Sequence, residues 1–537
     1  MNRIYKVVWS KVKHAYVVTS ELAKSHTKSA SGKAAKAVLA TAVGIGFLMG
    51  GYAADAADTA TGSGNGVAYG TGSNAPKAEN VAIGKDATIS YSGGVGMPST
   101  GDIVIGNKAR TNNYIDQGGG IAIGSNSFVE NMVGGLERSF DFNQAGYNSL
   151  FGVPYGLPKH PDKMVTGVAI GQNTYARSGS VMLGTHNYKG TLGDVTVDSA
   201  DVRSHNLLPF ATALGANSYS HGLFSSVTGA YSIISSNYDG NNSSAAGKNF
   251  GATITGSLNS IESATSSSNY SGVANSIVGT ANRTFNSNGS LIFGAGNEIT
   301  NSITSISAPS GNSTSAKDLA DTLRAAVKTS KSGGATLAIG GGNTADWTQL
   351  SQIIGVNNTL KGTSGAISKF NMIDGYKNTV TKAEHVFVIG SENTVENSKS
   401  QTVIGDSNKI TDRNAGTVSG HQEERTKNVS DLVIGKGNDI SGNDTYMKGY
   451  ESLTVIGNNN KAVNPSSGIV IGDNQKLSAI KESVVIGSMT PEEKADSDIQ
   501  QKHASVVVGY HAQSGTRDGG GMNVALGHGA KAYGWQE

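Results

Sequence analysis

The sequence has 537 residues and a formal net charge of +2, and its composition is unlike that of an ordinary cytosolic enzyme. Glycine contributes 73 residues, roughly double its usual share, whereas charged residues make up only 15% of the chain. The absence of cysteine excludes disulfide scaffolds, thiolate nucleophiles and cysteine-ligated metal centres. The glycines follow no strict triplet period, so the composition disfavours collagen and favours another kind of internal repetition.

The segment at 1–56 has the properties of an export signal. Eight basic residues precede an uncharged, mostly apolar run at 37–52, which is shorter than the ~20 residues of a membrane-spanning helix. The small residues on either side of Asp55 predict cleavage between Ala56 and Ala57, and a retained anchor is the alternative. Without this segment the chain has 34 basic and 38 acidic residues, so it has no basic excess that would favour nucleic acid as a partner.

The long region before the apolar run carries a more specific pattern. Residues 1–24 read MNRIYKVVWSKVKHAYVVTSELAK. This region resembles the extended signal peptide region of type V secretion systems, and the matching positions are Asn2, Ile4, Tyr5, Lys6, Val7, Trp9 and the SELA stretch at 20–23. The resemblance implies recognition by the export machinery, passage through the inner membrane and a final place at the outer membrane and cell surface, facing the exterior.

A short apolar triplet that ends in glycine recurs along the remaining sequence. Clear copies are VAIGKDATI at 81–89, FVIGSENTV at 387–395 and TVIGDSNKI at 402–410. Several of the glycines are evenly spaced, as Gly390 and Gly405 are, which predicts a structural repeat of about 15 residues. The positions to which we assign this repeat are Ile83, Gly84, Ile123, Gly124, Ile170, Gly171, Ile389, Gly390, Asn393, Ile404, Gly405, Asn408, Ile434, Gly435, Asn438, Ile456, Gly457, Asn460, Ile471 and Gly472.

The repeat has the chemistry of a coil built from short strands. Each triplet is β-branched or leucine-rich and too short for a helix, and the glycine permits the positive φ angle of a sharp turn. The asparagine that follows is expected to tolerate the left-handed conformation and to bond its own neighbouring backbone. Stacked coils would pair like strands at a spacing of ~4.8 Å, so the sequence predicts an all-β chain whose body is a parallel β solenoid.

Both faces of each triplet are apolar. Because side chains alternate along a strand, Val81 and Ile83 share one face while Ala82 points the other way. A strand that is apolar on both faces is expected to be buried on both. We expect the larger residues to fill the narrow interior of the coil and the small ones to face a partner chain, so that Ile404→Asp would bury an unpaired carboxylate.

These repeats, behind such a signal, resemble the head of YadA-like trimeric autotransporter adhesins. The resemblance implies a left-handed parallel β-roll, a homotrimer and a role in adhesion, virulence and biofilm formation. Its implied ligands are host extracellular matrix, host cell surfaces and the surfaces of other bacteria. The sequence shows no sustained heptad stalk and no C-terminal set of amphipathic strands that could anchor it. We therefore expect a fragment of a longer adhesin, a truncated gene product or a head that attaches by other means.

Two insertions interrupt the predicted coils. The first carries Phe140, Phe142, Tyr147, Phe151 and Tyr155, and it is expected to contact a ligand or to form a lid packed on the roll. In the second, residues 316–328 place Leu319, Leu323 and Ala326 on one face of a short helix, which would dock on the roll or bind a partner. The predicted organisation is an extended signal peptide at 1–56, β-roll repeats at 57–130, the aromatic insertion at 131–166, β-roll repeats at 167–299, the insertion with a helix at 300–335, and β-roll repeats at 336–537.

A search for catalytic, cofactor and metal sites assigns no residue. The sequence has no phosphate-binding GxxxxGK[ST] and no HExxH, and its 11 histidines are scattered. His421, Glu423 and Glu424 are a weak candidate for a metal site and are expected to lie in a solvated loop instead. We therefore expect a non-enzymatic adhesin head that works by multivalent binding through unknown contact residues. The alternative is a secreted β-solenoid enzyme that acts on polysaccharide.

Overall fold

The computed structural model consists of two units, residues Met1–Thr59 and Ala60–Glu537. The structure describes residues 5–10, 15–20, 62–92, 101–114, 118–131, 166–188, 210–235, 248–263, 271–303, 306, 308, 316–329, 336–414, 430–442, 452–478, 480–491, 504–515 and 523–533. In the first unit, β1 (Tyr5–Ser10) and β2 (Ala15–Ser20) form an antiparallel pair within the signal region.

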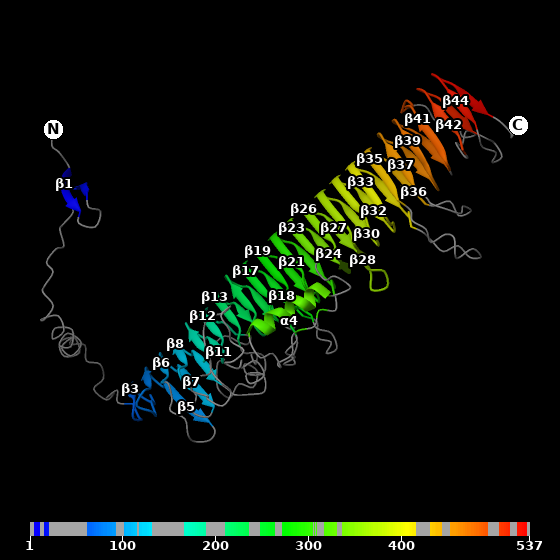
Figure 1. Ribbon diagram of the computed structural model, residues 1–537. Coiled ribbons are helices and arrows are strands. Elements are labelled where there is room, and N and C mark those ends of the chain that lie inside the picture. Colours follow the sequence, from blue (N-terminus) through cyan, green and yellow to red (C-terminus); the bar gives the residue numbers. More distant parts are fainter. Residues whose placement is uncertain are drawn as a thin grey trace. The chain divides into compact units, whose positions relative to one another are not determined.

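The second unit is a solenoid whose first side is a long parallel sheet. Its 22 described strands pair in single file, coil after coil, from β3 to β44 (Figure 1). The strands are β3 (Val67–Tyr69), β4 (Val81–Ile83), β6 (Ile103–Ile105), β8 (Ile121–Ile123), β10 (Val168–Ile170), β12 (Val181–Thr185), β13 (Thr212–Ala216), β15 (Ser226–Thr228), β17 (Thr253–Ser257), β19 (Ser276–Thr280), β21 (Leu291–Ala295), β23 (Leu337–Gly341), β26 (Gln352–Val356), β29 (Met372–Tyr376), β31 (Phe387–Ser391), β33 (Gln401–Asp406), β35 (Asp431–Lys436), β37 (Leu453–Ile456), β39 (Gly468–Ile471), β41 (Ser483–Ile486), β42 (Val506–Val508) and β44 (Val524–Leu526). Like residues pair across coils, since Ile404 lies between Ile389 and Ile434.

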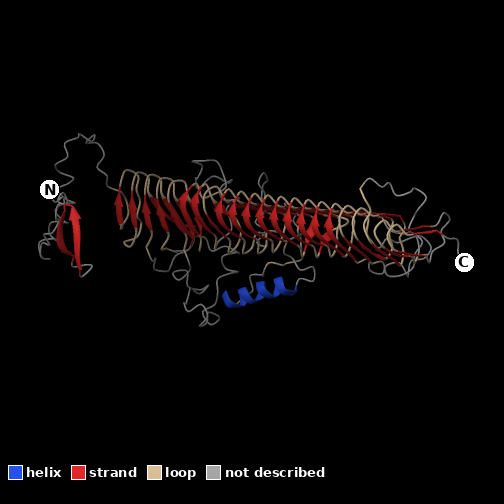
Figure 2. Cartoon of the chain, turned by 90° about the horizontal axis from the view of Figure 1, so that it is seen from above, coloured by secondary structure: helices blue, strands red, loops and turns tan. Residues whose placement is uncertain are grey.

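The second side of the coils is built from further parallel strands, which face the first sheet across the solenoid (Figure 2). A 4-stranded sheet begins it, with β5 (Thr88–Ser92), β7 (Arg110–Tyr114), β9 (Phe128–Asn131) and β11 (Tyr175–Arg177). A 13-stranded sheet continues it, with β14 (Tyr219–Ser220), β16 (Ile233–Ser235), β18 (Ser260–Glu262), β20 (Arg283–Phe285), β22 (Glu298–Thr300), β24 (Thr344–Asp346), β27 (Thr359–Lys361), β30 (Thr379–Thr381), β32 (Thr394–Glu396), β34 (Lys409–Thr411), β36 (Asp439–Ser441), β38 (Lys461–Val463) and β40 (Lys476–Ser478). The pair β43 (Gln513–Gly515) and β45 (Lys531–Tyr533) lies toward the C-terminus.

A third, shorter side closes some of the coils. It contains the paired strands β25 (Thr348–Gln349) and β28 (Ser368–Lys369), and single bridges then join Lys369 to Glu384 and Glu384 to Lys399. The all-β parallel solenoid that the sequence predicts is therefore confirmed, and glycines one repeat apart, such as Gly390 and Gly405, pair in adjacent coils. Its left-handed sense and its three-fold assembly stay predictions of the resemblance.

A column of glycines turns the chain at the end of each strand of the first sheet. Gly390 has a φ of 131°, and a Cβ placed on it would overlap the carbonyl oxygen of Gly405 in the next coil. Side chains are disfavoured both by this backbone angle and by the close approach of the next coil. Glycine is therefore required at this corner for two independent reasons.

The interior of the coil is the reverse of what the sequence analysis expects. Ala82 and Val433, the middle residues of their triplets, are fully buried inside the coil. Ile83 and Ile434 point outward and are partly exposed, and Ile471 is 38% exposed. The prediction was wrong because strand alternation separates two faces without saying which one points inward. The two sheets of a coil pack closely, and the middle position of each strand is the one that fits between them.

Buried asparagines occupy the corner between the first and second sheets. Asn393 donates from Nδ2 to Asn378 Oδ1 at 2.9 Å and to the Gly405 carbonyl oxygen at 2.6 Å. Its own Oδ1 accepts bonds from the backbone N–H and the Nδ2 of Asn408. The same pattern runs through Asn259, Asn282, Asn297, Asn343, Asn358, Asn378, Asn393, Asn408, Asn438 and Asn460. We call these residues the asparagine ladder.

The ladder corrects the role that the sequence analysis gives to these asparagines. The left-handed residue is the one before the asparagine, such as Glu392 with a φ of 58° or Ser407 with a φ of 56°. The asparagine itself bonds to the neighbouring coils. Because a buried amide needs partners for both its oxygen and its nitrogen, a column of stacked amides satisfies each member in turn.

The predicted helix is present as α4 (Ala316–Thr329). Leu319 is 7% exposed and packs in a cluster with Leu223, Phe250, Val273 and Ile306. Leu323 and Ala326 pack against the same cluster, so the apolar face predicted from the sequence covers the coils (Figure 2). No helix in the described ranges combines the length and apolar character required to cross a lipid bilayer.

Candidate functional site

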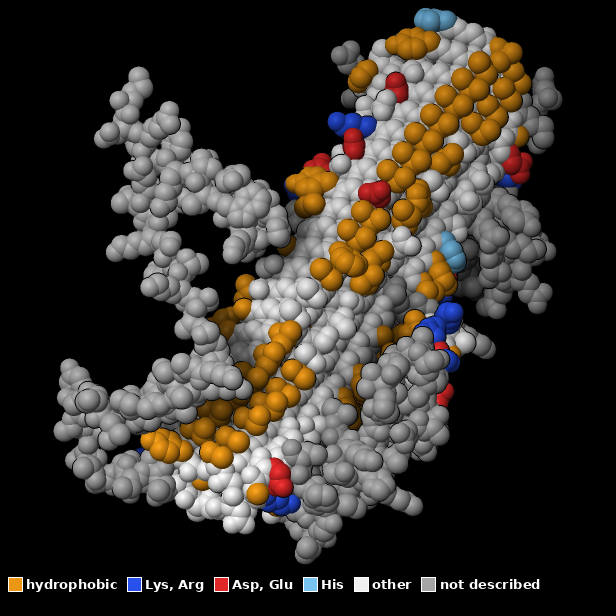
Figure 3. Space-filling view, turned by 60° about the vertical axis from the view of Figure 1, so that its left-hand side comes forward, with side chains coloured by type: hydrophobic (Ala, Val, Ile, Leu, Met, Phe, Trp, Pro, Cys, Tyr) orange, Lys and Arg blue, Asp and Glu red, His pale blue; other side chains and the backbone are white. Residues whose placement is uncertain are grey.

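Two surfaces of the solenoid are candidates for binding. The first, which we call the apolar stripe, consists of the outward side chains of the first sheet (Figure 3). Its most exposed members are Val67, Tyr69, Ile103, Ile105, Ile170, Val278, Phe293, Ile339, Ile389, Ile456, Ile469, Ile471, Ile486, Val506, Val508, Val524 and Leu526. Since soluble single chains rarely expose a long contiguous apolar surface, this stripe is a candidate protein interface.

The stripe is not uniform along the solenoid. From β13 to β19 most of the outward positions are hydroxyl-bearing, at Thr212, Ser226, Thr228, Thr253, Thr255 and Ser276, while Leu214 and Val278 are apolar. Figure 3 shows two apolar stretches on this face with a paler band between them. Further along, Asp374 of β29 lies in register between Ile354 and Ile389 and places a carboxylate within the stripe. The stripe therefore consists of two apolar stretches joined by a polar one.

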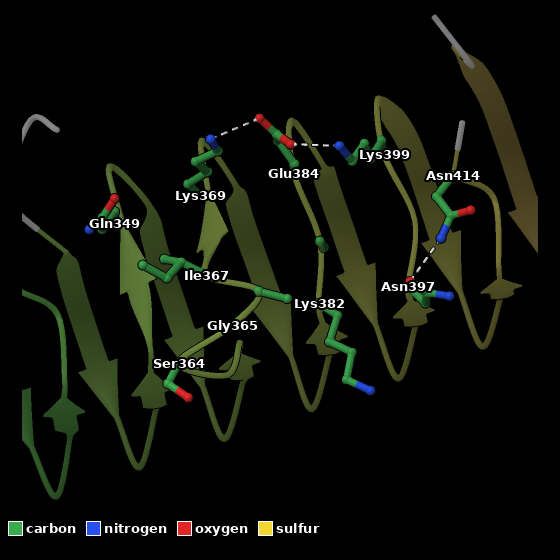
Figure 4. A pocket seen from close by; sticks show the side chains of 12 residues that line it. Gln349, Ser364, Gly365, Ile367, Lys369, Lys382, Glu384, Asn397, Lys399 and Asn414 are labelled. Atoms are coloured by element: carbon green, nitrogen blue, oxygen red, sulfur yellow. Dashed lines mark hydrogen bonds and ion pairs between the residues drawn. The ribbon is translucent and has the colours of Figure 1, made fainter. Parts of the chain in front are cut away.

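The second surface is an open pocket of about 450 Å³, which we call the lysine pocket (Figure 4). It extends over successive coils, and its lining includes Gln349, Lys369, Lys382, Glu384, Lys399 and Asn414. Some of these residues lie on the third side of the coil, and the others lie at the corner between the second sheet and the third side. The pocket is therefore not on the apolar stripe.

An inserted loop forms one wall of the pocket. Gly355 pairs with Gly375 in the next coil, and the chain between them is longer than the chain between the preceding pair, Gly340 and Gly355. The extra length makes a tight turn in which Thr363 and Ala366 exchange two backbone hydrogen bonds of 2.9 and 3.1 Å. Ala366 and neighbouring loop residues line the pocket from this turn.

Charged side chains line the opposite edge. Glu384 lies between two lysines, with its Oε1 3.3 Å from Lys369 Nζ and its Oε2 3.0 Å from Lys399 Nζ (Figure 4). Partial burial acts to raise the pKa of Glu384, but the hydrogen bonds and charges of Lys399 and Lys369 outweigh it and lower the pKa below its usual value. Glu384 is therefore ionised at neutral pH. Lys382, across the pocket, has no ion-pair partner among the described residues.

The structure places the sequence-assigned repeat residues in three columns. The isoleucines are the last residues of their triplets and point outward, the glycines form the turn column, and the asparagines belong to the ladder. The predicted cleavage site at Ala56 and Ala57, the candidate metal ligands His421, Glu423 and Glu424, and the aromatic residues of the first insertion lie outside the described residues.

The lysine pocket was missed by the sequence analysis, although two signals for it exist. Lys369, Glu384 and Lys399 follow one another at the spacing of one coil, the same spacing that separates Gly390 from Gly405. Residues separated by one coil lie side by side in a solenoid, so alternating charge at this spacing predicts a row of ion pairs. The second signal is the wider spacing between Gly355 and Gly375, which marks an inserted loop.

Comparison with known proteins supports the export route and the resemblance. Residues 1–49 match the family model described as the extended signal peptide of type V secretion system. The autotransporter adhesin NhhA of Neisseria meningitidis serogroup B is 51% identical over 41 residues, which are 8% of this chain and 7% of that protein. No solved structure matches the chain.

The signal and the fold together bear out the resemblance to autotransporter adhesins. The chain carries the export signal of type V secretion, and it is exported to the outer membrane and cell surface. The body behind that signal is a parallel β solenoid, as the resemblance implies. The matched segment spans only a small part of the relative, so what the whole relative does is not transferred to this chain by identity.

Proposed function

We propose that residues behind the signal form the head of a homotrimeric adhesin that attaches the cell to host matrix, host cells or other bacteria. The observation that supports this proposal is the apolar stripe, which runs along the first sheet of an exported solenoid. The same proposal keeps the predicted division of the chain, with cleavage between Ala56 and Ala57 and the head repeats behind it.

The stripe has the physical properties of an interface. Covering a side chain such as Ile389, which is 37% exposed, contributes on the order of 0.5–1 kcal/mol from its remaining apolar surface. This contribution recurs in coil after coil, so a long solenoid accumulates enough apolar burial to offset the entropy of association. Closed rotational symmetry repeats one such contact between identical chains. The three-fold number follows from the resemblance.

A rigid trimer would work through multivalency. Three identical heads in one body convert weak single contacts into strong attachment when the spacing of the ligand matches that of the sites. The lysine pocket is available for such contacts because its residues do not belong to the stripe.

The experiment measures mass and attachment on the same purified protein. Light scattering is expected to give three times the chain mass, and surfaces coated with matrix protein, host cells or bacteria are expected to retain the trimer. Ile404→Asp is expected to reduce the mass to that of one chain while the β-type circular dichroism spectrum stays. A folded wild-type protein that is monomeric and attaches to none of the three surfaces would contradict the proposal. Release of oligosaccharides from a polysaccharide would favour the secreted-enzyme alternative.

A further inference from the structure

The lysine pocket has the composition of a binding site, and we propose that it binds an acidic saccharide. The lysines would hold its anionic groups, and Phe370 and His385, which follow the pocket residues Lys369 and Glu384 in the chain, would support a sugar ring. This inference rests on the proposed adhesive function, because it names a class of ligand for the head.

The pocket stays accessible when the stripe is covered. Its residues belong to the third side of the coil and to the corners after β30, β32 and β34, whereas the stripe belongs to the first sheet. A trimer assembled through the stripe would therefore present three copies of the pocket outward.

The charge of the pocket favours an anion. Three lysines and one glutamate line it, so its net charge is +2. Glu384 is shared by Lys369 and Lys399, and each ammonium group has three N–H donors, of which this contact uses one. Lys382 lines the other side of the pocket, where its side chain points away from Lys369 and Lys399 (Figure 4), and it has no ion-pair partner in the described part of the chain. A saccharide that carries several carboxylate or sulfate groups can therefore contact Lys369 or Lys399 through one group and Lys382 through another.

An exposed aromatic pair adjoins these charges. The rings of Phe370 and His385 are stacked with centroids 4.7 Å apart and an angle of 16° between their planes. Phe370 is 42% exposed and the His385 side chain 59%, and Lys369 Nζ lies 5.7 Å from the Phe370 ring centroid. Flat aromatic surface beside polar groups suits a sugar ring, which offers C–H groups on its face and hydroxyls at its edge.

Other polyanions fit this surface less well. Nucleic acid is bound by many cations along a groove, and these phosphate contacts supply most of its affinity. Here the excess charge is confined to one pocket, and the chain behind the signal has more acidic than basic residues. The amide groups of Gln349, Asn397 and Asn414 already bond within the protein, but each NH₂ carries a second N–H, and the hydroxyl of Ser364 adds a further polar group, so the lining suits sugar hydroxyls.

The test uses the full secreted protein with dextran sulfate as the charged probe and dextran as its uncharged parent. Dextran sulfate is expected to bind, with an affinity that falls as salt rises, and dextran is expected not to bind. Lys382→Glu is expected to weaken binding by about tenfold or more, because it removes a charged donor and adds a repelling charge. The fold is expected to tolerate this change, since a glutamate, Glu392, already adopts the left-handed conformation at another corner with a φ of 58°, where Lys382 has 49°.

Matched controls separate the pocket from general charge. Lys409→Glu makes the same change at an exposed position outside the pocket and is expected to leave the affinity unchanged. The double variant Phe370→Ala, His385→Ala is expected to weaken dextran sulfate but not polyglutamate, which carries charge without sugar rings. Equal losses of dextran sulfate affinity in Lys382→Glu and Lys409→Glu would show that the pocket is not the binding site. An unchanged affinity for dextran sulfate in the double variant would show that the site does not recognise the sugar ring.

The oligomer mass of each sample separates this inference from the proposed function. A trimer that fails to bind dextran sulfate overturns the saccharide pocket while leaving the trimeric head in place. A monomer that binds dextran sulfate in a Lys382-dependent way supports the pocket and contradicts the trimer.

Discussion

Val403 and Ile404 are neighbours in β33 with opposite environments. Val403 is fully buried inside the coil, whereas Ile404 belongs to the outward face. We expect Val403→Asp to destabilise the fold by about 3 kcal/mol or more, because it buries an unpaired carboxylate. Ile404→Asp, which the sequence analysis assigned to the core, is expected to keep the fold and weaken association. Thermal unfolding of both variants decides this, and equal losses of stability would contradict the assignment of the faces.

The asparagine ladder predicts that the chemistry of the amide matters more than its size. Asn393→Asp keeps the shape but replaces the Nδ2 donor by an oxygen that faces Asn378 Oδ1 and the Gly405 carbonyl. We expect it to destabilise the protein at pH 7 at least as much as Asn393→Ala, which costs about 1–3 kcal/mol for each partner left unsatisfied. Urea unfolding measures both. An unchanged free energy of unfolding in Asn393→Asp would mean that the ladder does not contribute to stability.

A buried carboxyl in the N-terminal coils makes stability depend on pH. Asp102 accepts bonds from Tyr91, Asn113 and Gly120, each 2.9 Å long. Burial raises the pKa of Asp102 to about 6, although these hydrogen bonds and the charge of Lys77 oppose the shift. The folded state therefore holds the proton more tightly than the unfolded chain, whose carboxyl has a pKa near 3.8.

The sign of the effect follows from this difference. The stabilisation is fully present below pH 4 and is lost as pH rises from about 4 to about 6, by an amount on the order of 3 kcal/mol. Asp102→Asn is expected to abolish this decline, whereas Glu79→Gln at an exposed position nearby is expected to preserve it. Stability curves at pH 4, 5, 6 and 7 test it, and identical curves for the two variants would exclude Asp102 as the cause.

At the scale of elements, α4 depends on its contact with the coils. Its charged residues are arranged as helix ends prefer, with Asp318 in the first turn and Lys328 in the last. A helix of 14 residues is nevertheless marginal by itself, so packing of Leu319 supplies most of its stability. Leu319→Ala is expected to cost roughly 2 kcal/mol of docking and to speed hydrogen exchange in α4. Thr322→Ala on the exposed side is the control, and equal exchange in both variants would contradict docking.

At the scale of the whole molecule, each coil contacts mainly the coils before and after it. In such a solenoid, stability is close to a sum of coil and interface contributions. A disruption in β33 by Val403→Asp is therefore expected to open nearby coils such as β31 and β35 while β4 to β12 stay protected. Hydrogen exchange followed by mass spectrometry resolves the two regions. Uniform loss of protection from β4 to β44 would show that the solenoid unfolds as one cooperative unit.

Much of the fold was predictable because its signals are local. A glycine such as Gly390 marks a turn by its own backbone freedom, and triplets such as the one before it mark strands by their side chains. The helix at 316–328 was predictable for the same reason. The ladder role of Asn393 and the lysine pocket were not predicted, since both depend on side-chain contacts between coils, which appear in the sequence only when residues one coil apart are compared.

The export signal, the coil length and the parallel pairing were readable from the chain alone, because the signal is a contiguous motif and the coils repeat a short pattern at a fixed spacing. The tertiary structure decided which face of each strand lies inside, and it brought Lys369, Glu384 and Lys399 into one pocket. It also buried Arg413 completely against Asp431, with two hydrogen bonds of 2.8 Å, a contact that the sequence analysis did not predict. The physical reason is the same in each case: burial depends on how neighbouring coils pack, and the sequence of a single coil does not contain that information.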